Sequence, residues 1–112
     1  DLQLLVEAGF GLIRVYSGGY HGRMVVELIS EQDLDLKVKL GAYVSFRMQT
    51  HGEENQLELR RVIELANQYP DVVAAVSVGN EVLVSWSFVP VPPEEMVAHI
   101  RYVRARIAQP VT

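Results

Sequence analysis

Three short apolar runs along the chain have the pattern expected of strands in a buried parallel sheet. They cover residues 12–16, 36–44 and 72–78, and each ends in small or polar residues. The segment 110–112 has the character of the first residues of another strand. The hydrophobic pattern therefore predicts three strands, with a further one beginning at the end of the sequence.

Apolar positions spaced by three and four residues predict a helix before each of these strands and one more after the third. The first helix should end at Gly9, because glycine suits the position after a helix, and the second surrounds Val25 and Ile29. The third is the clearest, and Pro70 ends it because proline cannot continue the backbone hydrogen bonds. Its apolar series is Leu59, Val62, Ile63, Ala66 and Tyr69.

The fourth predicted helix begins at residues 92–95 (PPEE), where prolines and carboxylates suit a helix N-terminus. It is expected to bury Met96, Ile100, Val103 and Ile107. The alternation of helices and strands implies parallel strands joined by crossover helices. Two α/β architectures fit: part of a (β/α)8 TIM barrel, or a small open sheet of the Rossmann kind.

The side-chain alternation in the third strand distinguishes these two architectures. One face carries Ala74, Val76 and Val78, and the other carries Ala75, Ser77, Gly79 and Glu81. The bulky face suits a layer of helices, while the small face suits a crowded barrel interior. A complete barrel takes roughly 250 residues, so we predict that residues 1–112 form one half-barrel fragment.

Composition excludes several classes of protein. The chain has 112 residues, 49% of them hydrophobic and 21% charged, as in an ordinary globular domain. A net charge of −4 without a basic cluster argues against nucleic-acid binding. The absence of cysteine excludes disulfides and thiolate metal sites, and no cofactor is predicted.

The candidate chemistry lies at the carboxyl ends of the strands, where parallel α/β folds carry their sites. Glu81 closes the stretch VGNE of residues 78–81 and is the carboxylate placed directly at such an end. A carboxylate in that position can protonate a leaving oxygen, as glycosidic cleavage requires, and Asn80 can donate a hydrogen bond to a sugar hydroxyl. The alternative interpretation is a solvated glutamate that begins a loop.

Aromatic side chains follow the same strands, and flat rings can stack on the apolar faces of sugars. They are Tyr16, Tyr20, Tyr43, Phe46, Trp86 and Phe88. Trp86, the single tryptophan, is the best candidate for a sugar platform, although packing is an ordinary role for each of these rings.

Two histidines offer a competing site. His21 and His51 also follow predicted strands, so with Glu81 they could form a two-histidine, one-carboxylate metal site. The sequence has no short spacing between metal ligands, such as His-x-x-x-His, that would support such a site, and we predict no metal. We interpret residues 17–22 (SGGYHG) as a flexible loop, because they match neither of the glycine-rich phosphate motifs.

Six segments together resemble glycoside hydrolase family 17. They are residues 4–10 (LLVEAGF), 13–16 (IRVY), 37–41 (KVKLG), 63–71 (IELANQYPD), 78–83 (VGNEVL) and 109–112 (QPVT). The resemblance implies a retaining β-1,3-glucan hydrolase or glucanosyltransferase that acts on extracellular, periplasmic or cell-envelope glucans. It implies Glu81 as acid/base and Asn80 as a substrate contact, with Tyr16 contributing to a glucose subsite.

The same resemblance implies that the chain is only the N-terminal half of such an enzyme. The nucleophile of the family, a glutamate after the seventh strand, has no counterpart here, and retaining cleavage needs two carboxyl groups about 5 Å apart. We therefore expect the isolated chain to be inactive. The alternatives are the metal-dependent hydrolase and a non-catalytic half-barrel that at most binds glucan. Unpaired strand edges also predict self-association.

Overall fold

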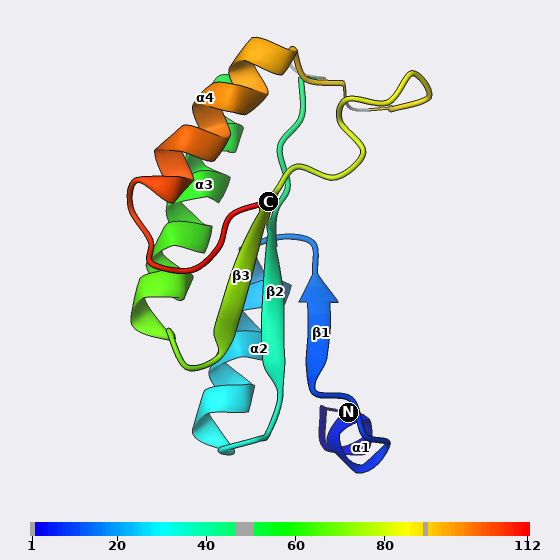
Figure 1. Ribbon diagram of the computed structural model, residues 1–112, viewed down its shortest axis with the longest axis vertical. Helices are drawn as coiled ribbons and strands as arrows, with labels where there is room; N and C mark the ends of the chain where they lie inside the picture. The colour runs from blue at the N-terminus through cyan, green and yellow to red at the C-terminus, as the bar shows by residue number, and fades with distance from the viewer. Residues whose placement is uncertain (1, 47–50, 89) are drawn as a thin grey trace.

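The computed structural model describes residues 2–46, 51–88 and 90–112 (Figure 1). Helices and strands alternate along it, as the hydrophobic pattern predicts. Their order is α1 (Leu2–Glu7), β1 (Leu12–Val15), α2 (Tyr20–Glu31), β2 (Lys37–Ala42), α3 (His51–Gln68), β3 (Val73–Val78) and α4 (Pro93–Arg104). None of the helices in these ranges is long and apolar enough to cross a membrane.

The three strands form a parallel sheet in the sequential order β1-β2-β3. Crossovers between parallel strands are almost always right-handed, so connections that step in one direction place their helices on one face. Figure 1 shows α2, α3 and α4 on the same side of the sheet. In a doubly wound sheet of order 3-2-1-4-5-6 the fourth strand would lie beside β1, whereas here Val111, near the end of the chain, pairs with Val76 of β3. The predicted partial barrel is therefore confirmed, and the open Rossmann-like sheet is wrong.

The end of the chain begins to extend the sheet beyond β3. The N–H of Val76 donates to the carbonyl of Pro110, and the N–H of Thr112 donates to the carbonyl of Val76, each at 2.9 Å. Val76 and Val111 form a parallel bridge. The prediction that residues 110–112 begin another strand is confirmed.

The hydrophobic core lies between the sheet and the helices. Val38 of β2 is paired with Val73 of β3, and Leu40 is paired with Val76, and all four side chains are fully buried. Helix α3 contributes further fully buried side chains, namely Leu59, Val62, Leu65 and Ala66. Burying a side chain of this size favours folding by roughly 1.5–3 kcal/mol, so this layer supplies most of the stabilisation.

A bulge in β3 changes which residues face the core. Val38 pairs with Val73 but Lys39 pairs with Ala75, so Ala74 is an extra residue without a partner in the ladder. Ala74 is exposed, whereas Val73 is fully buried. The prediction that Ala74 shares the core face with Val76 is wrong, because the bulge shifts the alternation by one residue.

Helix ends follow the predicted signals with two exceptions. Gly9 has a φ of +87° and its N–H donates to the carbonyl of Val6 at 2.9 Å, which is the glycine-capped helix end expected there. Helix α2 begins at Tyr20, so the predicted loop over 17–22 is wrong in its second half. Ile107 lies beyond the end of α4 and packs half-buried against the core from the following loop.

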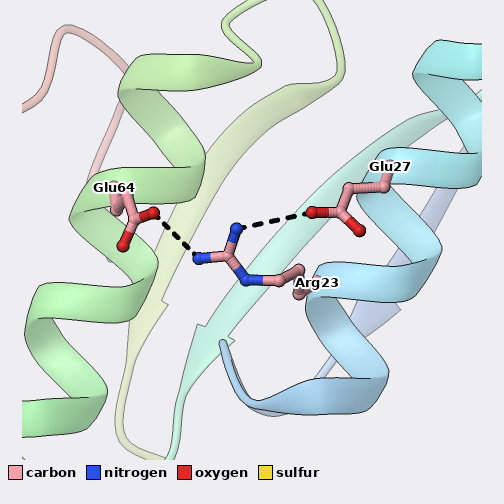
Figure 2. Close-up of polar contacts among 3 residues, drawn as sticks. All are labelled: Arg23, Glu27 and Glu64. Carbon is pink, nitrogen blue, oxygen red and sulfur yellow. Dashed lines mark hydrogen bonds and ion pairs between the residues drawn. The ribbon is translucent and has the colours of Figure 1, made fainter.

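An ion pair joins α2 and α3. Arg23 of α2 places Nη2 3.0 Å from Glu64 Oε1 of α3 and Nη1 3.4 Å from Glu27 Oε1 on its own helix (Figure 2). The hydrogen bond to Glu64 raises the pKa of the Arg23 guanidinium above its ordinary value. Because these groups are partly solvated, such pairs contribute roughly 0–1 kcal/mol. The core, and not this pair, holds the helices in place.

Gly41 of β2 provides a test of how closely the end of β1 lies against β2. A Cβ at Gly41 would lie 2.7 Å from both the carbonyl oxygen of Val15 and the backbone carbon of Tyr16. Gly41→Ala must push these strands apart, and we expect a loss of about 1–3 kcal/mol in the free energy of unfolding. Chemical denaturation followed by circular dichroism measures this.

The matched control is Gly52→Ala in α3, where an added Cβ meets nothing within 4 Å. Alanine is favoured over glycine in a helix by about 1 kcal/mol, so this variant should be as stable as the parent or more so. Equal stability of the Gly41→Ala chain and its parent would contradict the close passage.

Candidate functional site

Four of the residues predicted to act lie just after the strands of the sheet. Tyr16 follows β1, Tyr43 follows β2, and Asn80 and Glu81 come after β3. Because the strands are parallel, their carboxyl ends meet at one edge, which lies toward the top of Figure 1. The structure thus places the candidate residues along a single rim.

The backbone at the end of β3 turns sharply where Glu81 lies. Gly79 has a φ of +81° and Glu81 has a φ of +52°, so a residue with a side chain occupies the left-handed region. That conformation costs roughly 1–2 kcal/mol outside glycine. The turn leaves Glu81 exposed and returns the next residue, Val82, to the core. Strain is therefore stored at the predicted catalytic position, as often happens at functional sites.

Asn80 is held by a residue that the sequence pattern did not single out. Arg14 of β1 donates from Nη2 to Asn80 Oδ1 at 2.9 Å, and its guanidinium carbon lies 4.5 Å from the centre of the Tyr16 ring. Since β2 lies between β1 and β3, the Arg14 side chain extends across β2, on the face of the sheet that the helices do not cover (Figure 1). Gly41, on that face of β2, presents no side chain in its way. The signal in the sequence was a lone arginine within an apolar strand.

The rim is divided into separate hollows. One of about 560 Å³ is lined by Arg14, Tyr16, Tyr20 and His21 among others. A second, of about 370 Å³, is lined by Tyr43 together with polar residues of α3. Glu81 lines a third, of about 300 Å³, in otherwise largely apolar surroundings that include Met96. Arg14 contacts both Tyr16 and Asn80, whereas Tyr16, Tyr43 and Glu81 line three different hollows.

Trp86 belongs to the long loop between β3 and α4. The N–H of Val91 donates to the carbonyl of Val82 at 3.1 Å, and both side chains are buried, so the loop is closed at its base. Within it Trp86 is 69% exposed. The other aromatic residues predicted at the rim are also exposed, namely Tyr20, Phe46 and Phe88. An accessible tryptophan has the exposure that a sugar platform requires.

The histidines do not assemble with Glu81. His21 lies exposed in the first turn of α2, in a different hollow from Glu81, and the side chain of His51 lies outside the described residues. Across 2–46, 52–88 and 90–112 no group of three or more His, Cys, Asp or Glu side chains could hold a metal ion. His99 is buried on α4, with Nε2 3.2 Å from Glu95 Oε1 one turn earlier, which is a structural role.

Comparison with known proteins gives a match in structure alone. No protein-family model matches the chain, and no curated protein matches it. A solved structure that resembles it is that of an endo-laminarinase from Formosa Hel1_33_131, with a TM-score of 0.78 and 22% sequence identity. The likeness covers 94% of this chain and 31% of the other, so this chain spans about a third of that protein's length. At this identity the match shows a shared fold.

The strained turn at Glu81 makes a prediction about stability. Glu81→Gly should raise the free energy of unfolding by about 0.5–1 kcal/mol, because glycine adopts a positive φ without steric cost. Glu81→Gln retains the Cβ and should stay within about 0.5 kcal/mol of the parent. Thermal and chemical denaturation measure both.

Asp33 supplies the matched control, because it too has a positive φ, of 49°, but lies between α2 and β2, away from the rim. Asp33→Gly should stabilise the chain to a similar extent. If Asp33→Gly stabilised the chain but Glu81→Gly destabilised it, the positive φ at Glu81 would not be a source of backbone strain.

Proposed function

We propose that this chain is part of a retaining β-1,3-glucan hydrolase or transglycosylase of the family 17 kind, with Glu81 as its acid/base. One observation carries the proposal: Glu81 lies in the turn that follows β3, at the carboxyl edge of a partial barrel. Retaining glycosidases require a carboxylic acid beside the leaving oxygen. Support comes from the likeness of fold to a protein described as an endo-laminarinase.

Asn80 is assigned the role of a substrate contact. Its Oδ1 accepts the hydrogen bond from Arg14, which leaves its NH₂ group to donate to a sugar hydroxyl. Arg14 would act as a positioning residue that sets the rotamer of Asn80 and supports the Tyr16 ring. Tyr16, Tyr43 and Trp86 would stack on the apolar faces of successive glucose units.

The chain alone is proposed to lack a nucleophile. Retaining chemistry needs a second carboxylate about 5 Å from the first. Glu58 is a carboxylate near the rim, but its side chain is buried and accepts hydrogen bonds from two backbone N–H groups, so it is not available to attack a sugar. We therefore assign the 112 residues the binding of glucan and one half of the catalytic pair.

Binding and turnover by the purified chain test this proposal. Laminarihexaose should change the fluorescence of Trp86, which is the single tryptophan in the sequence, while laminarin stays uncleaved. Asn80→Ala should weaken binding by about tenfold, as expected for loss of one hydrogen bond in a partly dehydrated site.

Asn67→Ala is the control, because Asn67 lies at the far end of α3 and donates to the carbonyl of Arg106. Its affinity should equal that of the parent chain. Absence of any binding would contradict the proposed function, and turnover that is lost in Glu81→Gln would contradict the missing nucleophile.

A second function, that of a non-catalytic self-associating module, is favoured by the surface around β1. Among the described strands β1 pairs only with β2, so its other edge is open. Leu4, Phe10 and Leu12 are exposed beside that edge. Open edges flanked by apolar side chains promote pairing with another chain.

Self-association should be visible as a dimer or larger species by light scattering coupled to gel filtration. Leu12→Lys, which adds charge at the open edge, should shift the population toward monomer. Val97→Lys is the control, because Val97 is an exposed apolar residue on α4, which packs against β3 at the opposite side of the sheet from β1. A parent chain that stays monomeric at high concentration would contradict this second function.

A further inference from the structure

A single buried carboxylate joins the loops that follow β1 and β2. Glu58 of α3 is 6% exposed, and its Oε1 accepts hydrogen bonds from the N–H of Gly18 at 2.7 Å and the N–H of Tyr43 at 3.1 Å. Gly18 lies shortly after β1, and Tyr43 directly follows β2. One oxygen atom therefore fixes the carboxyl ends of two strands to the same point on α3.

The two backbone N–H groups are the principal partners of this carboxylate. Arg61 Nη1 lies 3.9 Å from Glu58 Oε2, which is beyond hydrogen-bond distance, and the Arg61 side chain is partly exposed to solvent. A buried carboxylate is costly unless hydrogen bonds compensate its lost hydration. The buried Glu58 side chain thus depends on both loops for its hydrogen bonds.

Gly18 shows how closely the first loop lies against α3. A Cβ at Gly18 would meet Val62 Cγ1 at 2.7 Å and Val62 N at 3.1 Å. Only glycine fits this position without displacing the loop. The hydrogen bond to Glu58 and the contact with Val62 therefore act on the same short segment.

Asn55, one turn before Glu58, holds the second loop at another point. Ser45 donates its N–H to Asn55 Oδ1 at 2.9 Å, and Asn55 Nδ2 donates to the carbonyl of Ser45 at 2.8 Å. Asn55 is 2% exposed. The segment from Tyr43 to Ser45 is thus attached to α3 at both of its ends.

We propose that Glu58 is a positioning residue that sets the spacing between Tyr16 and Tyr43 for a bound glucan; this inference rests on the proposed function. The two rings are 55% and 48% exposed, and each belongs to one of the tethered segments. Ser17, between Tyr16 and Gly18, lines both the 560 Å³ and the 370 Å³ hollow. A saccharide that occupies both hollows must pass this shared wall.

The tether lowers the cost of binding because the rings are ordered before the sugar arrives. Ordering a loop or side chain on association costs free energy that otherwise subtracts from affinity. Glu58 borders the 370 Å³ hollow but is only 6% exposed, so its two hydrogen bonds to the loops are the contribution that we assign to it. Its contribution passes entirely through the backbone of Gly18 and Tyr43.

Amide hydrogen exchange and glucan affinity, measured on the same variants of the full chain, test the proposal. In Glu58→Ala the N–H groups of Gly18 and Tyr43 should exchange at least about tenfold faster, because each loses its hydrogen-bond acceptor. The dissociation constant for laminarihexaose should rise by about tenfold. Glu58→Gln keeps an Oε1 acceptor and should fall between parent and Glu58→Ala in both measurements, which also secures the test if Glu58→Ala unfolds.

The control is Glu64→Gln, which removes a carboxylate charge from the same helix at the exposed pair with Arg23. It should change neither the exchange rates of the Gly18 and Tyr43 N–H groups nor the affinity for laminarihexaose. Unchanged exchange at Gly18 and Tyr43 in Glu58→Ala would overturn the tether. Faster exchange with unchanged affinity would overturn the positioning role. A parent chain that binds no laminarihexaose would refute the proposed function and with it the positioning for glucan, while the exchange rates would still decide whether the tether exists.

Discussion

The packing of the valine- and leucine-rich faces of β2 and β3 against α3 is the contact on which the remaining structure depends. Because the strands follow one another in order, the helices cover one face of the sheet, and the other face stays free for polar and small residues. Arg14 can therefore cross that free face to reach Asn80. Helix α3 contributes to the core and also fixes the carboxyl ends of two strands. Its Leu59 and Val62 lie in the core, while Glu58 accepts hydrogen bonds from the segments that follow β1 and β2.

The order of elements could be predicted because its signals are local. Apolar spacing, the glycine after α1 and Pro70 after α3 each act within a few residues of the boundary that they set. The bulge at Ala74 could not be predicted in this way, because it arises from pairing between β2 and β3, which are far apart in the sequence. The start of α2 was missed because the glycines at 18, 19 and 22 suggested a loop; a Cβ at Gly22 would lie 1.9 Å from the carbonyl oxygen of Ser17, so the chain is compact there.

The position of the candidate site could be predicted from the sequence, but the residues that hold its side chains and loops in place could not. Glu81, Asn80, Tyr16 and Tyr43 follow strands, and a parallel sheet brings strand ends to one edge whatever the details of packing. Glu58 and Arg14 act through contacts between distant segments, which periodicity does not reveal. A glutamate next to an apolar stripe and an arginine inside an apolar strand were the only traces of them. The likeness to part of an endo-laminarinase shows a shared fold, and the site and its chemistry remain a proposal.

Mapping the backbone amide shifts that laminarihexaose causes in the labelled chain tests the central claim most directly, because it locates the sugar without requiring turnover. The account predicts that the affected amides cluster after β1, β2 and β3, around Tyr16, Tyr43 and Asn80, and that α1 and the amino ends of the strands are unaffected. Shifts confined to those amino ends, or no shifts at saturating sugar, would contradict the assignment of the strand-end rim as a glucan site.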